Sequence, residues 1–447
     1  MLNSKVVSTG NASFESAGRG TIQPSRSGLC EQRANGGAVF GARPGIVAVS
    51  DVRQSEARAP IAKRGKEPAG KNAHSSLLGF VASPLVLLKD GVQWVADEYC
   101  VRKSYVAGRT AQDAVDVARE LQKREVSSIF NCLGEHSKAE ADVEKTVEEY
   151  LELVGLASKG GIGQATLAIR PSAFGADVSR EDRWEYCYEN MRTVVEAAKR
   201  EGYLVCIDME NLSYCDKTLE IHRRLQEKFG NVSTVLQANV KRSMQDLLAI
   251  LENPALAKIG TRLVRGIYEE DESVSYKGHE RIHGNYSEMM RAAFEKGPKG
   301  AHIIVGTHHE GRVLDALRLW AKHPDKTLEI QMLRGIKEDL AELLIRAGKI
   351  MGFGVSLYVP HGRHPAPYVL RRMGKSPSFA QMGVANTVSG LPKPIQAVVL
   401  HATHLIFNGV YRIVTGKKLK IEAAPGTEEE KRQLYLLLQE KGVQVPA

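Results

Sequence analysis

The feature that most constrains the fold is an alternation of short β-branched segments with longer segments of helical periodicity, from residue 125 to residue 376. Eight strand-like segments can be recognised, and a stretch with apolar residues at intervals of three and four separates each from the next. Eight strands alternating with helices is the pattern of a (β/α)8 barrel, whereas doubly wound sheets usually have about five to seven strands. We therefore predict an α/β protein with a TIM-like barrel over 125–376. The expected strands are Ser127–Leu133, Thr166–Arg170, Tyr203–Asp208, Thr234–Gln237, Thr261–Arg265, His302–Gly306, Leu328–Met332 and Val355–Val359.

The segments before the barrel have a different composition. Residues 1–74 are rich in Gly, Ser, Ala and Arg and show little periodicity, which predicts a disordered tail. A mitochondrial transit peptide is the alternative, although the start of the chain has no clear basic amphipathic helix. Helical periodicity in residues 75–124, clearest from Thr110 onward, predicts an N-terminal helical arm that packs on the barrel.

Residues 377–447 are predicted to form a C-terminal helical extension. Thr427 and Glu430 have the spacing of a capping box, which is expected to open its last helix. The same spacing at Ser137 and Glu140 predicts a capping box for the helix that follows the first strand.

Charge and cysteine content limit the partners and the compartment. The net charge is +9, but residues 1–70 hold ten Lys/Arg and five Asp/Glu, so the rest of the chain carries only +4 and no nucleic-acid partner is expected. The six cysteines form no Cys-x-x-Cys pair, which is typical of reduced thiols in an intracellular protein. A cytoplasmic location is expected, or a mitochondrial one if the source is eukaryotic.

No integral membrane segment is predicted. The apolar run at residues 77–88 is too short to span a bilayer. A helix with one apolar face is expected at residues 393–410; packing on the barrel is its first interpretation, and peripheral contact with the inner membrane is the second.

Polar residues gather where the predicted strands end. In barrel enzymes the working side chains lie at the carboxyl ends of the strands, and each of these residues alone has an ordinary structural explanation. Together, a mouth lined by arginines, amides and a tyrosine suits an anionic ligand. The residues in question are Arg170, Asp208, Glu210, Gln237, Arg262, Arg265, Tyr268, Thr307, His308, His309, Gln331 and Tyr358.

Two adjacent arginines, Arg371 and Arg372, follow the last predicted strand. Guanidinium groups bind carboxylates through paired hydrogen bonds, so this pair suits a small acidic substrate. The glycines at residues 160–163 lie before a strand, not between a strand and a helix, and therefore do not form a dinucleotide-binding turn. A nucleotide cofactor would have to be held by the strand ends instead.

The segment from Tyr358 through Tyr368 to Arg371 and Arg372 resembles the C-terminal signature of the proline dehydrogenases, in particular the single-function FAD-dependent type. Six further blocks match this family in the right order, over about residues 125–375. The blocks are Leu133-Gly-Glu135, Ile207-Asp-Met-Glu210, Leu236-Gln-Ala238, Arg262-Leu-Val-Arg-Gly-Ile-Tyr268, Gly306-Thr-His-His309 and Glu329-Ile-Gln-Met-Leu-Arg-Gly-Ile336.

The resemblance implies roles for particular residues. Arg262 would lie nearest the flavin N5, where a positive charge favours the reduced flavin. Arg371 and Arg372 would hold the substrate carboxylate, Asp208 would orient the arginines, and Leu263, Tyr268 and Tyr358 would close the pocket for the ring, with Arg170 beside them. The residues expected to line FAD are Gln237, Arg262, Val264, Arg265, Gly266, Thr307, His308 and Gln331.

This chain departs from the family pattern at several of these positions. Arg170 and Arg265 stand where the family has Lys, and His309 stands where it has Asn. Lys375 replaces a Glu one turn after the arginine pair, and His361 and the prolines of the last turn also differ. These differences leave the identity of the substrate ring open.

The function expected from the resemblance is FAD-dependent oxidation of L-proline to 1-pyrroline-5-carboxylate, with hydride transfer to the flavin N5 and electrons passed to a quinone. The same chemistry on a related ring, such as hydroxyproline or a secondary-metabolite precursor, is one alternative. A metal-dependent barrel hydrolase that uses Asp208, Glu210, His308 and His309 is another, although no metal site is expected on the leading interpretation. The last alternative is a binding or regulatory barrel that catalyses no reaction.

Overall fold

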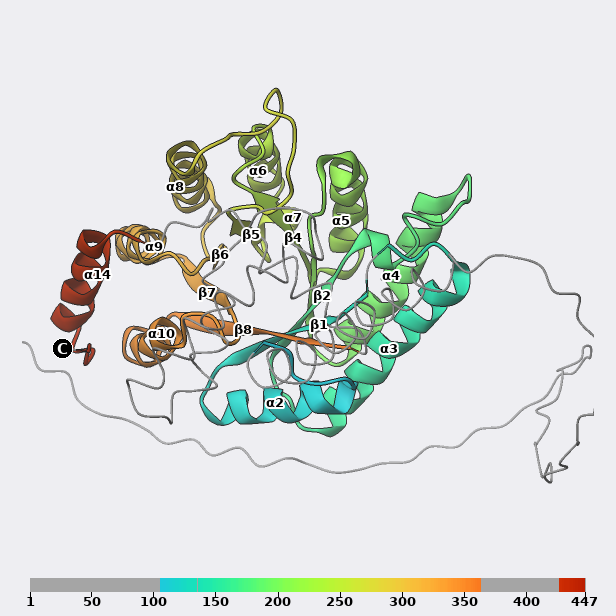
Figure 1. Ribbon diagram of the computed structural model, residues 1–447, viewed down its shortest axis with the longest axis horizontal. Coiled ribbons are helices and arrows are strands. Elements are labelled where there is room, and N and C mark those ends of the chain that lie inside the picture. The colour runs from blue at the N-terminus through green and yellow to red at the C-terminus, as the bar shows by residue number, and fades with distance from the viewer. Residues whose placement is uncertain (1–104, 135, 363–425, 447) are drawn as a thin grey trace, which may run out of the picture. The chain divides into compact units, whose positions relative to one another are not determined.

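The computed structural model describes residues 105–134, 136–362 and 426–446, and its central feature is a closed barrel of eight parallel strands in the order β1 to β8 (Figure 1). The barrel closes where β8 pairs with β1, with Tyr358 opposite Ile129. The predicted (β/α)8 fold is therefore confirmed. The strands are β1 (Ser127–Cys132), β2 (Ala165–Ile169), β3 (Leu204–Ile207), β4 (Val232–Gln237), β5 (Thr261–Val264), β6 (His302–Gly306), β7 (Thr327–Leu333) and β8 (Gly354–His361).

Helices follow each strand from β1 to β7 and surround the barrel in Figure 1. Two short 3-10 turns, Pro171–Ala173 and Leu212–Tyr214, lie after β2 and β3. The helices are α2 (Ala111–Lys123), α3 (Glu140–Lys159), α4 (Arg183–Arg200), α5 (Cys215–Phe229), α6 (Ser243–Glu252), α7 (Pro254–Ala257), α8 (His279–Lys296), α9 (Glu310–Lys322), α10 (Glu338–Met351) and α14 (Glu428–Glu440).

Side chains alternate between the two faces of the barrel wall, because successive residues of a strand point to opposite faces. Phe130, Leu167 and Leu263 belong to the large core between the strands and the helices. Ile129 and Tyr358 belong to a separate cluster inside the barrel. This parity decides which residues at the strand ends can reach the mouth.

Helix α2 covers the seam where β8 meets β1 (Figure 1). Its buried face, which includes Val115 and Leu121, joins the main core. Thr110 and Asp113 form a capping box at its start, so each side chain accepts a hydrogen bond from the other residue's backbone N–H where the helix begins. The helix predicted from Thr110 onward is confirmed.

Helix α14 packs on α9 near the end of the chain. Thr427 and Glu430 form the predicted capping box, and the Arg312 guanidinium lies 3.5 Å from the Glu430 carboxylate. Leu434 and Leu438 are fully buried in the main core. The last helix is therefore confirmed.

The capping box predicted at Ser137 and Glu140 is wrong. Helix α3 begins at Glu140 with Ala139 as its N-cap, and no side chain caps it. Glu140 instead accepts a hydrogen bond from Arg180 at 2.8 Å, while Ser137 is buried and its N–H donates to the Ser172 carbonyl. The Glu140 side chain therefore forms an ion pair with Arg180, a residue distant in sequence, instead of capping its own helix.

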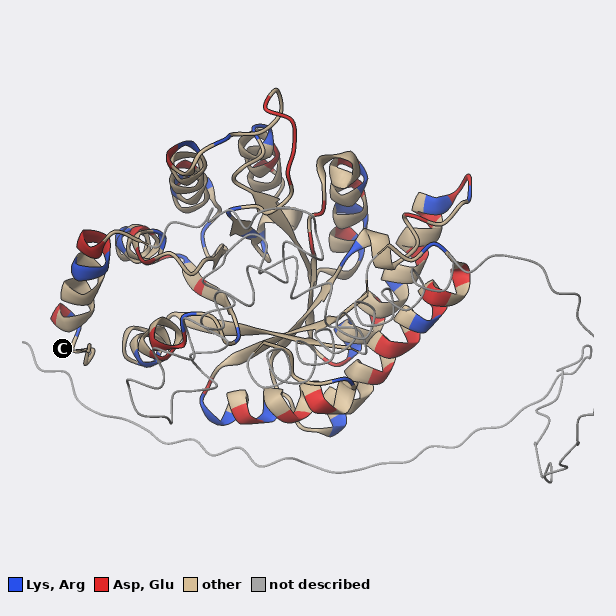
Figure 2. Cartoon of the chain, viewed as in Figure 1, with Lys and Arg blue, Asp and Glu red and all other residues tan. Residues whose placement is uncertain are grey.

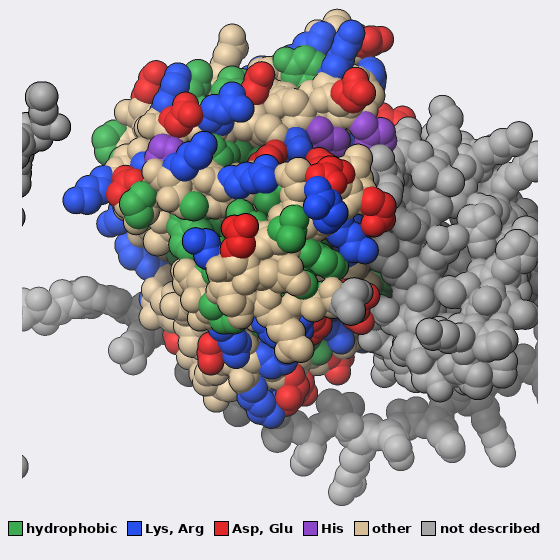
Figure 3. All heavy atoms as spheres, turned by 90° about the vertical axis from the view of Figure 1, so that its left-hand side faces the viewer, with side chains coloured by type: hydrophobic (Ala, Val, Ile, Leu, Met, Phe, Trp, Pro, Cys, Tyr) green, Lys and Arg blue, Asp and Glu red, His purple; other side chains and the backbone are tan. Residues whose placement is uncertain are grey.

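The predicted tail at residues 1–74, most of the arm at 75–124 and the apolar-faced helix at 393–410 lie outside the described residues. Within the part that is described, no helix combines the length and the apolar character that a membrane span requires. Charged residues are frequent on the outer helices, among them α3 (Figure 2). On the side that carries α14, acidic, basic and hydrophobic side chains are interspersed (Figure 3).

Candidate active site at the carboxyl end of the barrel

Asp208 is the hub of a charged network at the carboxyl ends of the strands. It directly follows β3, and its Oδ1 accepts a hydrogen bond of 2.9 Å from Arg262 Nη1 on β5. Its Oδ2 accepts one of 2.9 Å from the Tyr358 hydroxyl on β8 and lies 3.6 Å from Arg170 Nη2, which follows β2. Side chains from strands distant in sequence meet here because all parallel strands of a barrel end at the same face.

Arg170 is held by a residue that the sequence analysis missed. Its Nη2 donates to Asn131 Oδ1 at 3.2 Å, and Asn131 Nδ2 donates to the Ala168 carbonyl at 3.1 Å. Asn131 is fully buried on β1. A polar residue next to the end of a predicted strand was the available signal, since a buried polar group is retained only where it is paired.

Arg262 is only 6% exposed, yet most of its donors are uncommitted. Burial alone would lower the pKa of this guanidinium, but the nearby Cys206, Asp208, Tyr358 and Glu329 raise it, so the group stays charged. Its Nε and Nη2 atoms have no hydrogen-bond partner among the described residues. A buried cation with free donors is costly unless a ligand completes it.

Gln331 and Gln237 extend the polar lining to neighbouring strands. Gln331 Nε2 donates to Glu329 at 2.7 Å, and its Oε1 has no partner within the described part of the chain. Gln237 Nε2 donates to the backbone carbonyl of Glu210 at 2.8 Å. The Glu210 carboxylate is occupied by the N–H and hydroxyl of Ser172, and burial raises the pKa of Glu210.

Gly266 makes a tight turn directly after Arg265 with φ of +91°. A Cβ there would approach Asn239 Oδ1 to 1.7 Å, so a side chain at this position would displace Asn239. Asn239 Nδ2 donates to the Tyr268 carbonyl at 3.1 Å, while its Oδ1 has no partner in the described residues. The glycine thus allows two loops to approach closely beside the arginines.

The two histidines after β6 have structural contacts. His308 Nε2 accepts the N–H of Leu333 at 2.8 Å, and His309 Nδ1 accepts the N–H of Gly311 at 3.2 Å at the start of α9. Burial lowers the pKa of His309. The Thr307 hydroxyl stabilises the same loop after β6, because it accepts a hydrogen bond of 3.1 Å from the His309 N–H.

The metal-hydrolase alternative finds no support in this geometry. Asp208 is bonded to Arg262, and Glu210 is bonded to Ser172. Across the described ranges, no three His, Cys, Asp or Glu side chains are placed to share a metal ion.

Two residues lie elsewhere than the sequence analysis expected. Leu263 is fully buried in the core outside the barrel, because its neighbours Arg262 and Val264 occupy the inward positions, so it does not border the pocket. His361 is also buried away from the barrel interior, where its Nε2 lies 3.4 Å from Cys132 Sγ. Val264, Arg265 and Tyr268 are partly exposed near the end of β5. Arg371, Arg372 and Lys375 lie outside the described residues.

Comparison with known proteins identifies the family. The family model described as proline dehydrogenase matches residues 114–374. The chain is 26% identical over 280 residues to proline dehydrogenase 1 of Bacillus subtilis, covering 62% of this chain and 87% of that protein. It is 29% identical over 290 residues to the proline dehydrogenase of Deinococcus radiodurans, covering 64% and 89%.

A solved structure shares the fold. The crystal structure of proline utilization A (PutA) from Bdellovibrio bacteriovorus, inactivated by N-propargylglycine, aligns with a TM-score of 0.56 at 18% identity. The alignment covers 82% of this chain and 42% of that one, so this chain spans less than half of that protein. Since the family model covers more than half of the sequence, the chain belongs to the proline dehydrogenase family and is an oxidoreductase of proline oxidation.

Proposed function

We propose that this protein binds FAD at the carboxyl end of its barrel and oxidises L-proline to 1-pyrroline-5-carboxylate, passing the electrons to a quinone. The observation that carries the proposal is the buried Arg262, which Asp208 holds in place while two of its nitrogen atoms lack partners among the described residues. The quinone acceptor rests on the family resemblance alone, and a peripheral membrane contact rests on the apolar-faced helix expected at residues 393–410.

The residues present fit a flavin. Two nitrogen atoms of Arg262 have free N–H groups among the described residues, and Gln331 Oε1 offers a free acceptor on another strand of the wall. The polar edge of a flavin ring carries both carbonyl acceptors and an N–H donor, so it can satisfy both kinds of group. We assign FAD binding to Gln237, Arg262, Val264, Arg265, Gly266, Thr307, His308 and Gln331.

The bound flavin would supply the two-electron acceptor for a hydride from the substrate. The protein's own residues would bind and orient the substrate beside it. Asp208 would keep Arg262 and Tyr358 in fixed positions, because each of its carboxylate oxygens accepts a hydrogen bond from one of them. A proton must also leave the substrate amine as the double bond to nitrogen forms.

The substrate pocket would be formed by Arg170, Asp208, Tyr268 and Tyr358, with Arg371 and Arg372 expected to hold the carboxylate. Leu263 is left out of this assignment because it lies in the outer core. His361 is left out as well, since it is buried against Cys132, and its difference from the family pattern gives no reason to expect a different ring.

Turnover with matched substrates and acceptors tests the proposal. The purified protein is incubated without oxygen with a soluble quinone and either L-proline or trans-4-hydroxy-L-proline, and quinone reduction is measured together with the cyclic imine formed. We expect L-proline to give the higher kcat/KM and one imine per quinone reduced. Activity with hydroxyproline alone would favour the related-ring alternative, and activity with a dye but not with a quinone would exclude the proposed acceptor.

A further inference from the structure

A buried carboxylate, Glu329, lies behind the predicted flavin-binding residues inside the barrel. Its Oε1 accepts hydrogen bonds from Gln331 Nε2 at 2.7 Å and from the Ser356 hydroxyl at 2.5 Å. Its Oε2 lies 2.7 Å from His302 Nε2, and His302 Nδ1 lies 2.8 Å from Thr327 Oγ1. The carboxylate thus connects a residue of the mouth with a histidine at the start of β6.

The charge on Glu329 fixes the direction of the Gln331 amide. Burial raises the pKa of Glu329, but the hydrogen bond and charge of His302, with the bonds from Ser356 and Gln331, outweigh it and hold the pKa below its usual range. An ionised carboxylate can only accept hydrogen bonds, so the NH2 group of Gln331 must face it. The amide oxygen must then point the other way.

That oxygen is the atom without a partner. Gln331 is 6% exposed, and its Oε1 has no hydrogen-bond partner among the described residues. A free amide could turn over to suit whatever ligand it meets, because its two ends have nearly the same shape. Here the reversed orientation would bring the amide oxygen against the carboxylate, and two acceptors repel.

We propose that Glu329 is a positioning residue that fixes Gln331 as a hydrogen-bond acceptor for the N–H edge of the flavin ring. This inference rests on the proposed function, since it requires a flavin at the mouth. An oxidised flavin ring carries one N–H group on its pyrimidine edge, between two carbonyl groups. A fixed acceptor therefore selects the N–H, whereas a fixed donor would pair with one of the carbonyls. Glu329 acts through Gln331 and has no assigned contact with the substrate.

Two substitutions separate orientation from charge. Glu329→Gln keeps an oxygen for Gln331 and Ser356, and its new NH2 can donate to His302, so the acceptor direction of Gln331 is preserved. Glu329→Leu removes the acceptor, so the amide of Gln331 is no longer held. We expect the Kd for FAD, measured by fluorescence titration of the full-length protein, to stay within about threefold for Gln and to rise about tenfold for Leu.

A double-mutant cycle with Gln331→Met shows whether Glu329 acts through the amide. Once the amide is gone, Glu329→Leu should change the FAD Kd by less than about twofold, because the two effects are coupled. A general loss of stability would instead add to the effect of Gln331→Met. Asn231→Ala is the matched control, because it removes buried hydrogen bonds to the Val195 and Tyr203 carbonyls at the opposite end of the barrel. It should lower Tm without changing the FAD Kd.

The outcomes distinguish this inference from the proposed function. If the wild-type protein binds FAD and is reduced by L-proline, but Glu329→Leu binds FAD as tightly as wild type, the positioning role is wrong and the proposed function stands. Additive effects in the cycle, or an equal loss in Glu329→Gln and Glu329→Leu, would also overturn the positioning role. If the wild-type protein binds no FAD, the proposed function itself fails.

Discussion

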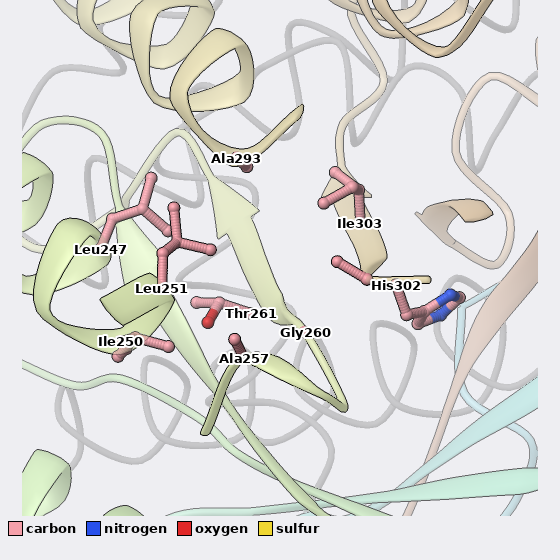
Figure 4. Close-up of a pocket in the computed structure, with 10 residues that line it drawn as sticks. Leu247, Ile250, Leu251, Ala257, Gly260, Thr261, Ala293, His302 and Ile303 are labelled. Atoms are coloured by element: carbon pink, nitrogen blue, oxygen red, sulfur yellow. The ribbon is translucent and has the colours of Figure 1, made fainter. Parts of the chain in front are cut away.

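The two ends of the barrel are built from the same strands but differ in which of their buried polar groups lack hydrogen-bond partners. At the carboxyl end, Arg262 is buried with two free nitrogen atoms, and the oxygen of Gln331 is also free among the described residues. At the amino end, a small crevice beside β5 and β6 has mostly aliphatic walls, including Leu247, Ile250 and Ile303 (Figure 4). Thr261 Oγ1 is also without a partner in the described structure there, but a neutral hydroxyl costs less to bury than a guanidinium.

This difference separates residues that support the fold from residues that await a ligand. An unsatisfied buried charge lowers stability, so a protein is expected to retain one only where function requires it. Substitutions at the carboxyl end should therefore change flavin binding and proline kinetics. Substitutions at the amino end that leave His302 in place should change stability alone.

The largest effect is expected for Asp208→Ala. Removing the acceptor leaves the buried Arg262 uncompensated and removes one hydrogen bond of Tyr358, and breaking a buried ion pair costs about 3–5 kcal/mol. We expect kcat/KM for L-proline to fall by about a thousandfold in steady-state assays.

Asp177→Ala is the matched control for that change. Asp177 has a similar exposure, 19% against 20% for Asp208, and it also has two partners, His136 and Tyr214. Among the described residues, Asp177 contacts neither Arg170 nor Arg262, so its loss should change kcat/KM by less than about threefold. Equal losses in the two variants would contradict the special role of Asp208.

Gly260→Ala tests the amino end. Gly260 has φ of +84°, and a Cβ would come within 1.8 Å of the His302 carbonyl oxygen, so the backbone must shift. We expect the free energy of unfolding to fall by about 2–4 kcal/mol in urea titrations. The kcat of the folded, FAD-loaded fraction should be unchanged. A shift of His302 that reaches Gln331 through Glu329 would raise the FAD Kd instead.

A smaller effect is expected for Tyr358→Phe, which removes one hydrogen bond to the Asp208 carboxylate. Loss of a single hydrogen bond to a charged group predicts about a tenfold decrease in kcat/KM, with FAD retained. Tyr286→Phe is the control, because that hydroxyl donates to the Leu263 carbonyl at 2.8 Å outside the barrel interior. It should lower Tm and leave kcat/KM unchanged.

The smallest effect concerns two buried histidines, one near each end. Burial lowers the pKa of His222, beside the start of β4, and of His361, at the end of β8, to about 4 in each case. The unfolded state, with a usual pKa of about 6.5, binds more protons between these values, so stability is lost as the pH falls from 6.5 toward 4. Each histidine should account for about 1 kcal/mol of the free energy of unfolding that is lost between pH 7 and pH 5.5.

Urea unfolding at these two pH values measures that contribution. His222→Gln and His361→Gln should each reduce the acid-induced loss by this amount. Variants with the same pH dependence as wild type would show that these histidines do not remain neutral in the folded protein.

The fold could be predicted because strand and helix periodicities alternate without interruption, and the strand ends agree with the structure within a few residues. Finer detail failed where a tertiary contact replaced a local one, as at Ser137 and Glu140, where Arg180 takes the carboxylate. Side-chain direction at strand ends was the second difficulty. A shift of one residue moves a side chain to the other face. Leu263 was assigned to the pocket from the family resemblance, whereas its side chain joins the outer core.

Arg170, Asp208, Gln331 and Tyr358 could be recognised in the sequence because each is polar and lies at or near the carboxyl end of a predicted strand. Asn131 and Glu329 could not be assigned a role, because it depends on partners from β2, β6 and β8 that no local pattern reveals. Their signal in the sequence was only that a polar residue stood in a buried strand. The structure adds which polar atoms are satisfied and which are free.

The most direct test of the central claim is the absorption spectrum of the purified protein during anaerobic addition of L-proline. The account predicts a flavin band that bleaches as proline is added, in wild type and in Gly260→Ala, and that bleaches far more slowly in Asp208→Ala. A flavin band that proline leaves unchanged in the wild-type protein would contradict the claim that this mouth oxidises proline.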